Sequence, residues 1–264
     1  MLKLDKVSKL FNPGTPDEKI ALLGIDLQLN AGDFVTIIGS NGAGKSTLMN
    51  IISGVMKPDL GEVQIEGSPI SGLAEHERSR WIGRVFQDPM AGTSPHMTIE
   101  ENLAMAYKRG KGRGLSLGVN AAKRKQFREE LARLGIGLEN RLRAKVGLLS
   151  GGERQALSLL MATFTKPQIL LLDEHTAALD PARAELITKL TESIVREMKL
   201  TTLMVTHNME QAIRLGNRLI MMDKGQIILD IDEQRKKDLT VERLLGEFET
   251  ISGHKMADDR VVLG

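Results

Sequence analysis

Three short hydrophobic runs stand out along the chain of 264 residues, and each stops at a glycine or a polar residue. They cover residues 33–38, 168–172 and 201–206. Their positions are apolar nearly throughout instead of alternating with polar ones, which is typical of parallel strands covered on both faces. We therefore predict a mainly parallel sheet, with Gly39, Asp173 and His207 at the carboxyl ends of its strands, where such sheets bind ligands.

A helix is expected between the second and third runs. Asp180 is suited to cap its amino end, and Pro181 is suited to its first position. The apolar residues that follow recur at helical spacing: Leu186, Ile187, Leu190, Ile194 and Met198. Strands that alternate with helices predict an α/β fold.

Other parts of the chain have different patterns. Residues from about 88 to 160 are rich in helix formers, and we expect a helical subdomain inserted between two halves of the core. Residues 1–30 and 61–66 predict a small antiparallel β subdomain. One domain over residues 1–231 is then followed by a polar tail, 232–264, with one short helix that opens near Thr240 and frays after Ser252.

The composition of the chain limits the classes of function that it can have. Lys and Arg number 36 against 34 for Asp and Glu, a balance that argues against binding nucleic acid through bulk charge. The chain has no cysteine, which excludes disulfides and thiolate metal sites and suits a reducing cytoplasm. No apolar run approaches the roughly 20 residues that span a bilayer. We expect an intracellular soluble chain that reaches a membrane only through a partner.

The first run leads into a phosphate-binding motif, G-x-x-x-x-G-K-[ST]. The matching residues are Gly39, Ser40, Asn41, Gly42, Ala43, Gly44, Lys45, Ser46 and Thr47. Its glycines allow successive N–H groups to face phosphate oxygens, Lys45 adds a positive charge, and the Ser46 hydroxyl is suited to Mg²⁺. A Gly-rich turn that only caps a helix is the alternative, but the strand before it and the apolar helix after it favour nucleotide binding.

The second run ends in two carboxylates, Asp173 and Glu174. Ionised carboxylates are costly at a buried strand end unless they are paired or bind metal. Asp173 is therefore suited to bind Mg²⁺. Glu174 is suited to accept a proton from the water that attacks the γ-phosphate. The alternative is a strand that ends in two solvated acids.

One motif separates the phosphate-loop families from one another. Residues 149–155, Leu-Ser-Gly-Gly-Glu-Arg-Gln, precede an apolar helix and match the signature sequence of ABC-type ATPases. Further matches follow the order of that family: an aromatic at Phe11, the Q-loop glutamine at Gln87, the D-loop at Ala178-Leu179-Asp180 and the switch histidine at His207. Over about residues 2–230, the chain resembles the nucleotide-binding subunit of an ABC transporter.

The resemblance implies a RecA-like P-loop NTPase core and a dimer in which two copies of the chain sandwich two ATP molecules. Ser150, Gly151 and Gly152 of one copy would then offer a hydroxyl, N–H groups and a helix dipole to the γ-phosphate bound by the other. It further implies that His207 senses the γ-phosphate and holds Glu174 and the attacking water.

The remaining roles are also implied by the resemblance. Gln87 would reach Mg²⁺ and report ATP occupancy, and Phe11 would stack on adenine. Plainer roles compete: a helix cap at Ser150, a core-edge histidine at His207, a surface turn at Gln87 and core packing of Phe11.

One departure from the family pattern follows Glu174, where His175 replaces the usual proline. This histidine either tunes the hydrogen bonding of the glutamate or is a subfamily feature without catalytic duty. The run 174–181 resembles an importer-type branch that handles small solutes such as amino acids. A basic cluster is either a solvated face or a contact with anionic lipid or the permease: Lys108, Arg109, Lys111, Arg113, Lys123, Arg124 and Lys125.

We interpret the chain as an ATPase that binds ATP and Mg²⁺ and energises import of a small solute through a separate membrane permease. The resemblance implies a homodimer on the inner face of the cell membrane and an extracytoplasmic solute-binding protein. The alternative is an ATP-gated clamp that acts on nucleic acid or ribosomes, but the chain lacks the long coiled coils, zinc inserts or second cassette usual in such relatives. A small-molecule kinase is disfavoured by the signature motif.

Overall fold

The computed structural model describes residues 1–110 and 118–253, which form two compact units. Unit 1 combines residues 1–78 with the chain from Thr201 onward, and unit 2 spans Ser79–Leu200. Unit 2 is larger than the insertion expected at about 88–160, because it also includes two paired strands and a long helix. Lys111 and Arg113 of the basic cluster, and the tail beyond Gly253, lie outside the described residues.

Unit 1 contains an antiparallel sheet with the strand order β2-β1-β4-β5. Its strands are β1 (Leu2–Phe11), β2 (Lys19–Leu29), β4 (Leu60–Ile65) and β5 (Ser68–Pro69). Strand β1 pairs with both β2 and β4 and buries Leu2, Leu4 and Val7, with a register shift between Leu4 and Val7. This sheet is the antiparallel subdomain expected from the sequence. Its strands β1 and β2, of 10 and 11 residues, are longer than its other two strands.

The parallel strands of unit 1 carry the phosphate-loop motif. They are β3 (Phe34–Gly39), β8 (Thr201–Val205) and β9 (Arg218–Asp223), and β10 (Gln226–Ile231) runs antiparallel beside β9. Every residue of β3 and β8 is buried, as their continuous apolar runs predict. Helix α1 (Lys45–Ser53) contacts both β2 and β3 and buries Leu48, Met49, Ile51 and Ile52.

The far end of α1 is held by a buried arginine. Arg78, the last residue of α2 (Glu75–Arg78), is fully buried and donates to the carbonyls of Ile51 at 2.7 Å and Ile52 at 3.0 Å. A cation at the carboxyl end of a helix satisfies its last carbonyls and complements its dipole. The helix that begins at the phosphate loop is thus fixed at its other end.

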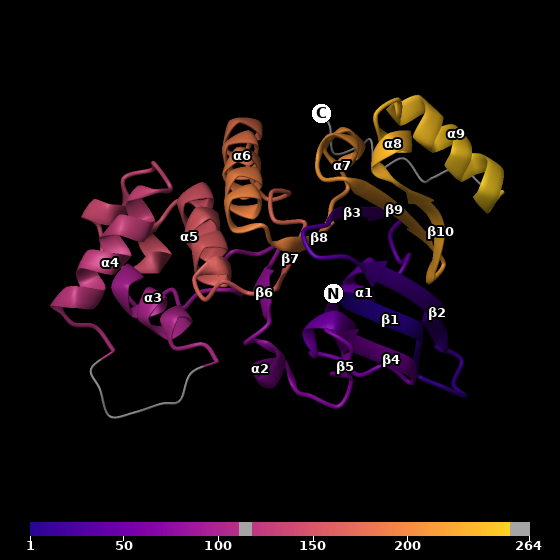
Figure 1. Cartoon of the computed structure of the whole chain (residues 1–264), viewed down its shortest axis with the longest axis horizontal. Helices are drawn as coiled ribbons and strands as arrows, with labels where there is room; N and C mark the ends of the chain where they lie inside the picture. The colour runs from indigo at the N-terminus through magenta and orange to yellow at the C-terminus, as the bar shows by residue number, and fades with distance from the viewer. Residues whose placement is uncertain (111–117, 254–264) are drawn as a thin grey trace. The chain divides into compact units, whose positions relative to one another are not determined.

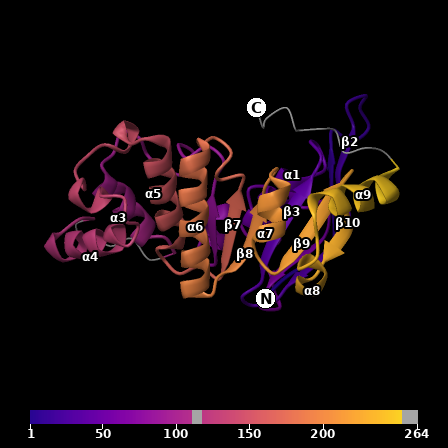
Figure 2. The same cartoon turned by 90° about the horizontal axis from the view of Figure 1, so that it is seen from above.

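The tail packs onto unit 1 through two helices, α8 (Glu233–Lys236) and α9 (Val241–Ser252), one more than the single helix expected. Thr240 caps α9, and Leu244 and Phe248 are buried against β9, β10 and α7 (Met209–Arg214). Figure 2 shows α9 lying along β10. This apolar contact makes the tail part of the unit that bears the phosphate loop.

Unit 2 is mainly helical around a parallel strand pair, β6 (Ile82–Val85) and β7 (Ile169–Asp173). Its helices are α3 (Ile99–Tyr107), α4 (Ala121–Ala132), α5 (Gly151–Thr163) and α6 (Pro181–Met198) (Figure 1), with short 3₁₀ turns at Leu138–Asn140 and Val146–Leu148. Helices α3, α4 and α5 share an apolar core in which Tyr107, Phe127 and Phe164 meet edge to face, 5.8–6.4 Å apart.

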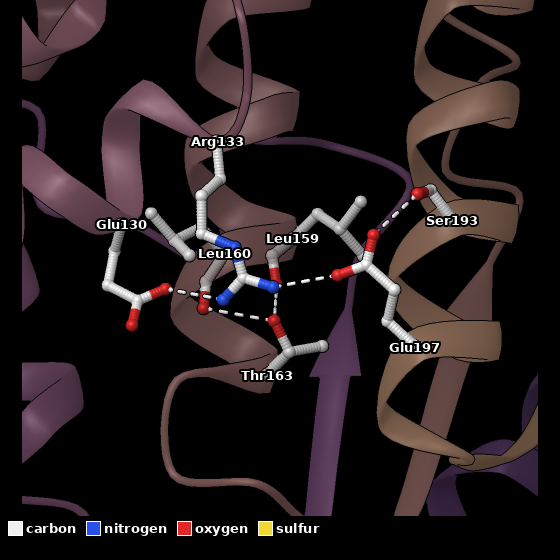
Figure 3. A network of polar contacts seen from close by, with 7 residues as sticks. All are labelled: Glu130, Arg133, Leu159, Leu160, Thr163, Ser193 and Glu197. Atoms are coloured by element: carbon white, nitrogen blue, oxygen red, sulfur yellow. Dashed lines mark hydrogen bonds and ion pairs between the residues drawn. The ribbon is translucent and has the colours of Figure 1, made fainter.

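A polar network joins the helices of unit 2 at their surface (Figure 3). Arg133, which follows α4, pairs with Glu130 at 3.2 Å and with Glu197 of α6 at 2.7 Å. Ser193 holds the other carboxylate oxygen of Glu197 at 3.0 Å, while the Thr163 hydroxyl donates within α5.

In the ranges 1–110 and 118–253, no helix combines the length and apolar character needed to cross a bilayer.

Candidate nucleotide-binding site

The phosphate loop of unit 1 is built on glycines that no other residue could replace without a shift of the backbone. A β-carbon on Gly39 would lie 2.2 Å from the carbonyl oxygen of Met222. One on Gly44 would lie 2.4 Å from the carbonyl oxygen of Ala21, and the φ of Gly44 is +101°. The tight turn therefore depends on the absence of side chains at these two positions.

Charge and hydrogen-bond donors converge inside this loop. Lys45 is 6% exposed, and its ammonium donates to the carbonyls of Gly39 at 2.6 Å and Ser40 at 3.1 Å. Helix α1 begins at Lys45, and no side chain caps its amino end at Gly44. The first N–H groups of α1 and the lysine thus suit a phosphate group, which has the negative charge that this end of a helix favours.

Unit 1 places His207 at the same sheet edge as the phosphate loop. Ile37 of β3 is in register with Val205 of β8, and the N–H of Thr206 donates to the carbonyl of Ile37 at 3.1 Å. Two residues further along each strand lie Gly39 and His207. The prediction that these strand ends meet at one edge is confirmed for this pair.

The hairpin of β1 and β2 brings a second cation to the loop, which the sequence analysis missed. Phe11 is in register with Lys19, so their side chains project from the same face of the hairpin. The Lys19 ammonium lies 3.6 Å from the position that a β-carbon on Gly42 would occupy. Pairing of these strands thus brings a lysine to the phosphate loop, on the face of the hairpin that also carries Phe11, the candidate adenine platform.

Unit 2 brings the acidic strand end and the Q-loop glutamine together. Val85 of β6 is in register with Leu172 of β7, so Gln87 and Glu174 both lie two residues beyond a paired position at the same edge. Glu174 has a φ of +46°, in the left-handed region that residues other than glycine rarely adopt. Such strain is concentrated at functional sites in proteins.

Asp173 is held by a partner that the sequence analysis also missed. The Arg84 guanidinium lies 2.9 Å from the Asp173 carboxylate, and the two side chains are only 11% and 15% exposed. The same guanidinium lies over the ring of Phe86, 4.8 Å from its centre. The only signal in the sequence is an arginine inside the otherwise apolar strand β6, and its partner is 89 residues away.

His175 is buried instead of facing a ligand, with 2% of its surface exposed. Its Nε2 lies 3.1 Å from the hydroxyl of Thr191 on α6. Burial lowers the pKa of His175 to about 4, because a charged imidazole would lose its hydration there. The side chain is therefore neutral near pH 7.

The signature residues form the amino end of α5. Ser150 caps the helix: its hydroxyl accepts from the Glu153 N–H at 3.3 Å, and the Glu153 carboxylate accepts from the Ser150 N–H at 2.8 Å. A β-carbon on Gly152 would lie 3.2 Å from the side chain of Arg183 in α6. Asp180 caps α6 by accepting from the Arg183 N–H at 3.1 Å. The capping roles of Ser150 and Asp180 are thus present.

The candidate magnesium ligands have suitable chemistry. Ser46 in unit 1, and Gln87 and Asp173 in unit 2, offer hydroxyl, amide and carboxylate oxygens, the hard ligands that Mg²⁺ prefers. Among the residues that the structure describes, no group of three or more His, Cys, Asp or Glu side chains could hold a metal by itself.

A phosphate loop after strand β3 of unit 1 and an acidic end of strand β7 in unit 2 are features of the P-loop NTPase fold. The profile of the ABC transporter family matches residues 22–177. The chain is 47% identical over 251 residues, 94% of its length and 99% of the relative's, to a tyrosine transport ATP-binding protein of Clostridioides difficile. The chain belongs to the ABC transporter family, as the signature motif predicts.

A second relative and a solved structure support the same family membership. A methionine import ATP-binding protein of Rhizobium etli is 38% identical over 212 residues, which are 79% of this chain and 56% of that relative. The structure also resembles an ATP-binding cassette solved as a post-hydrolysis dimer with ADP and Pi, with a TM-score of 0.76 and 32% identity, over 88% of this chain and 99% of that one.

Proposed function

We propose that this chain is the ATP-hydrolysing subunit of an importer for an amino acid or a similar small solute. The observation that carries the proposal is the 47% identity, along nearly the whole of both chains, to a tyrosine transport ATP-binding protein. A second copy of the chain, a membrane permease and an extracytoplasmic solute-binding protein complete the proposed system. The chain would then lie on the inner face of the membrane, attached through the permease.

The proposed roles in binding follow from the loop and its neighbours. The N–H groups at the start of α1 and the Lys45 ammonium hold the phosphates, and Phe11 stacks on the base. Ser46, Asp173 and Gln87 would hold Mg²⁺, directly or through water, and the ion would supply positive charge to the phosphates when bound. The other residues of the loop contribute backbone donors.

The proposed chemistry uses Glu174 as the general base. Its carboxylate accepts a proton from the water that attacks the γ-phosphate, and His207 orients that water and the glutamate. Ser150, Gly151 and Gly152 act on the nucleotide held by the other copy, through the hydroxyl of the cap and the N–H groups of α5. ATP binding closes the dimer, and hydrolysis reopens it.

Glu174→Gln tests the catalytic role. The substitution removes the proton acceptor but little volume, so we expect ATP affinity to be kept and turnover to fall about 100-fold or more. ATP binding is measured by titration, phosphate release by a coupled assay, and dimer formation by light scattering with ATP. Glu249→Gln, at an exposed carboxylate of α9, is the matched control. Rapid turnover by Glu174→Gln would overturn the role of this residue.

Uptake tests the transport function. Cells that lack the chain are compared with cells that carry the wild-type chain or Lys45→Ala, using labelled tyrosine, methionine and other amino acids. We expect uptake of one amino acid to require the wild-type chain. Capture from membranes with Glu174→Gln and ATP then identifies the permease. Equal uptake of every amino acid in all three strains would contradict the proposed import function.

A further inference from the structure

His175 makes one hydrogen bond, and the contacts around it indicate which group donates. Its Nε2 lies 3.1 Å from Thr191 Oγ1, and Thr191 Oγ1 lies 2.8 Å from the carbonyl oxygen of Ile187. A carbonyl can only accept, so the single hydroxyl proton of Thr191 is donated to Ile187. With its proton on Ile187, the hydroxyl accepts from His175, and Nε2 carries the proton of the imidazole.

The remaining nitrogen is consistent with this neutral tautomer. His175 Nδ1 is buried and has no hydrogen-bond partner among the residues that the structure describes. As an unprotonated nitrogen, it leaves no N–H group unsatisfied in the interior, where a lost donor bond is costly. His175 is thus a neutral donor anchored to α6 by one hydrogen bond.

His175 comes directly after a residue with a strained backbone, Glu174. Glu174 has a φ of +46°, a strained backbone conformation that persists only where the surroundings impose it. Before it, Asp173 ends strand β7, which is paired with β6. After it, the first side chain fixed in the interior is that of His175. Glu174 is therefore held between a paired strand and the bond from His175 to Thr191, and its carbonyl also accepts from the Ala177 N–H at 3.0 Å.

We propose that His175 is a positioning residue that fixes the backbone of Glu174, and with it the carboxylate, through the Nε2–H···Oγ1 hydrogen bond to Thr191. The inference rests on the proposed role of Glu174 as the general base. It assigns a duty to the position where the resemblance to the family leads one to expect proline. The proton stays on Nε2, and the imidazole itself takes no part in proton transfer.

The test compares two substitutions that keep a polar side chain at position 175. One can replace the hydrogen bond to Thr191, and the other cannot. In His175→Gln the amide nitrogen can take the place of Nε2, whereas the shorter side chain of His175→Asn leaves that place empty. We expect Asn to lower kcat about 10- to 100-fold, because small displacements of a catalytic group have effects of this size. ATP affinity should stay within twofold of the wild-type value, and Gln should restore most of the turnover.

Thr191 supplies the second half of the test. Thr191→Val should lower kcat as His175→Asn does, and the double variant should be no slower than either single variant, because both remove one interaction. Thr191→Ser should keep turnover. Thr163→Val is the matched control, since this buried hydroxyl of α5 also donates to a helix carbonyl, that of Leu159 at 2.9 Å (Figure 3). Unfolding midpoints show that each variant is folded.

The outcomes separate this inference from the proposed function. If Glu174→Gln stops turnover while His175→Asn keeps the wild-type kcat, the positioning role is wrong and the general base stands. Equal loss in Asn and Gln, or multiplied losses in the double variant, would also overturn it. If Glu174→Gln turns over rapidly, the proposed function of Glu174 fails first.

Discussion

The ion pair between Arg84 and Asp173 leads to a quantitative prediction for Arg84→Met. The pair is 2.9 Å long, with side chains 11% and 15% exposed. An exposed pair contributes about 0–1 kcal/mol, while breaking a buried pair from one side costs about 3–5 kcal/mol. These two side chains are mostly buried, and the contact with the Phe86 ring is also lost, so we expect a loss of about 2–3 kcal/mol in unfolding free energy.

The assay uses the single tryptophan of the chain. Trp81 lies in unit 2, directly before β6, so its fluorescence reports the unfolding of the unit that contains the pair. In urea without nucleotide and with EDTA, a loss of about 2–3 kcal/mol shifts the midpoint by roughly 1 M at a typical slope. Lys189→Met is the control, because its pair with Glu185 is 3.7 Å long and exposed.

A double-mutant cycle decides whether the effect comes from the charge left behind. Asp173→Asn removes the other charge, so Arg84→Met/Asp173→Asn should be more stable than the sum of the single losses predicts, by about 1 kcal/mol or more. Additive losses would show that Arg84 acts through packing alone. A midpoint shift as small as that of Lys189→Met would refute the reasoning altogether.

Three further predictions concern lysines. Lys45→Ala should weaken ATP binding and turnover together, and unchanged values of both would contradict the phosphate-loop assignment. Lys19→Met should weaken ATP binding about 2- to 5-fold, more at low salt, whereas Lys57→Met, past the far end of α1, should not. Burial lowers the pKa of Lys236 to about 8 from 10.5, so the unfolded chain binds more protons between these values. Unfolding free energy should therefore rise with pH across this range, by up to about 3 kcal/mol, and this rise should disappear in Lys236→Met.

Lys236 shows how the tail contributes to the site without forming part of it. Its buried ammonium donates to the carbonyls of Leu215 and Gly216, just beyond the end of α7. Helix α7 begins two residues after His207. The tail helix α8 thereby holds the element that follows His207, the candidate switch histidine.

Much of the site could be predicted from short stretches of sequence. The apolar run of β3, the phosphate loop and α1 are contiguous, and the caps at Ser150, Thr240 and Asp180 each act within their own first helical turn. Backbone propensity, capping and glycine geometry operate over a few residues, so the order of residues shows them directly. The chemistry expected of these motifs required no knowledge of distant contacts.

Contacts between distant residues required the folded chain. Arg84 and Asp173 meet because β6 and β7 pair in register, and Lys19 reaches the phosphate loop because β2 folds back on β1. The neutral state of His175 depends on its burial beside Thr191. Strand pairing and exclusion of water are properties of the assembled interior, and neither hydrophobic periodicity nor a motif specifies which polar groups will be brought together there.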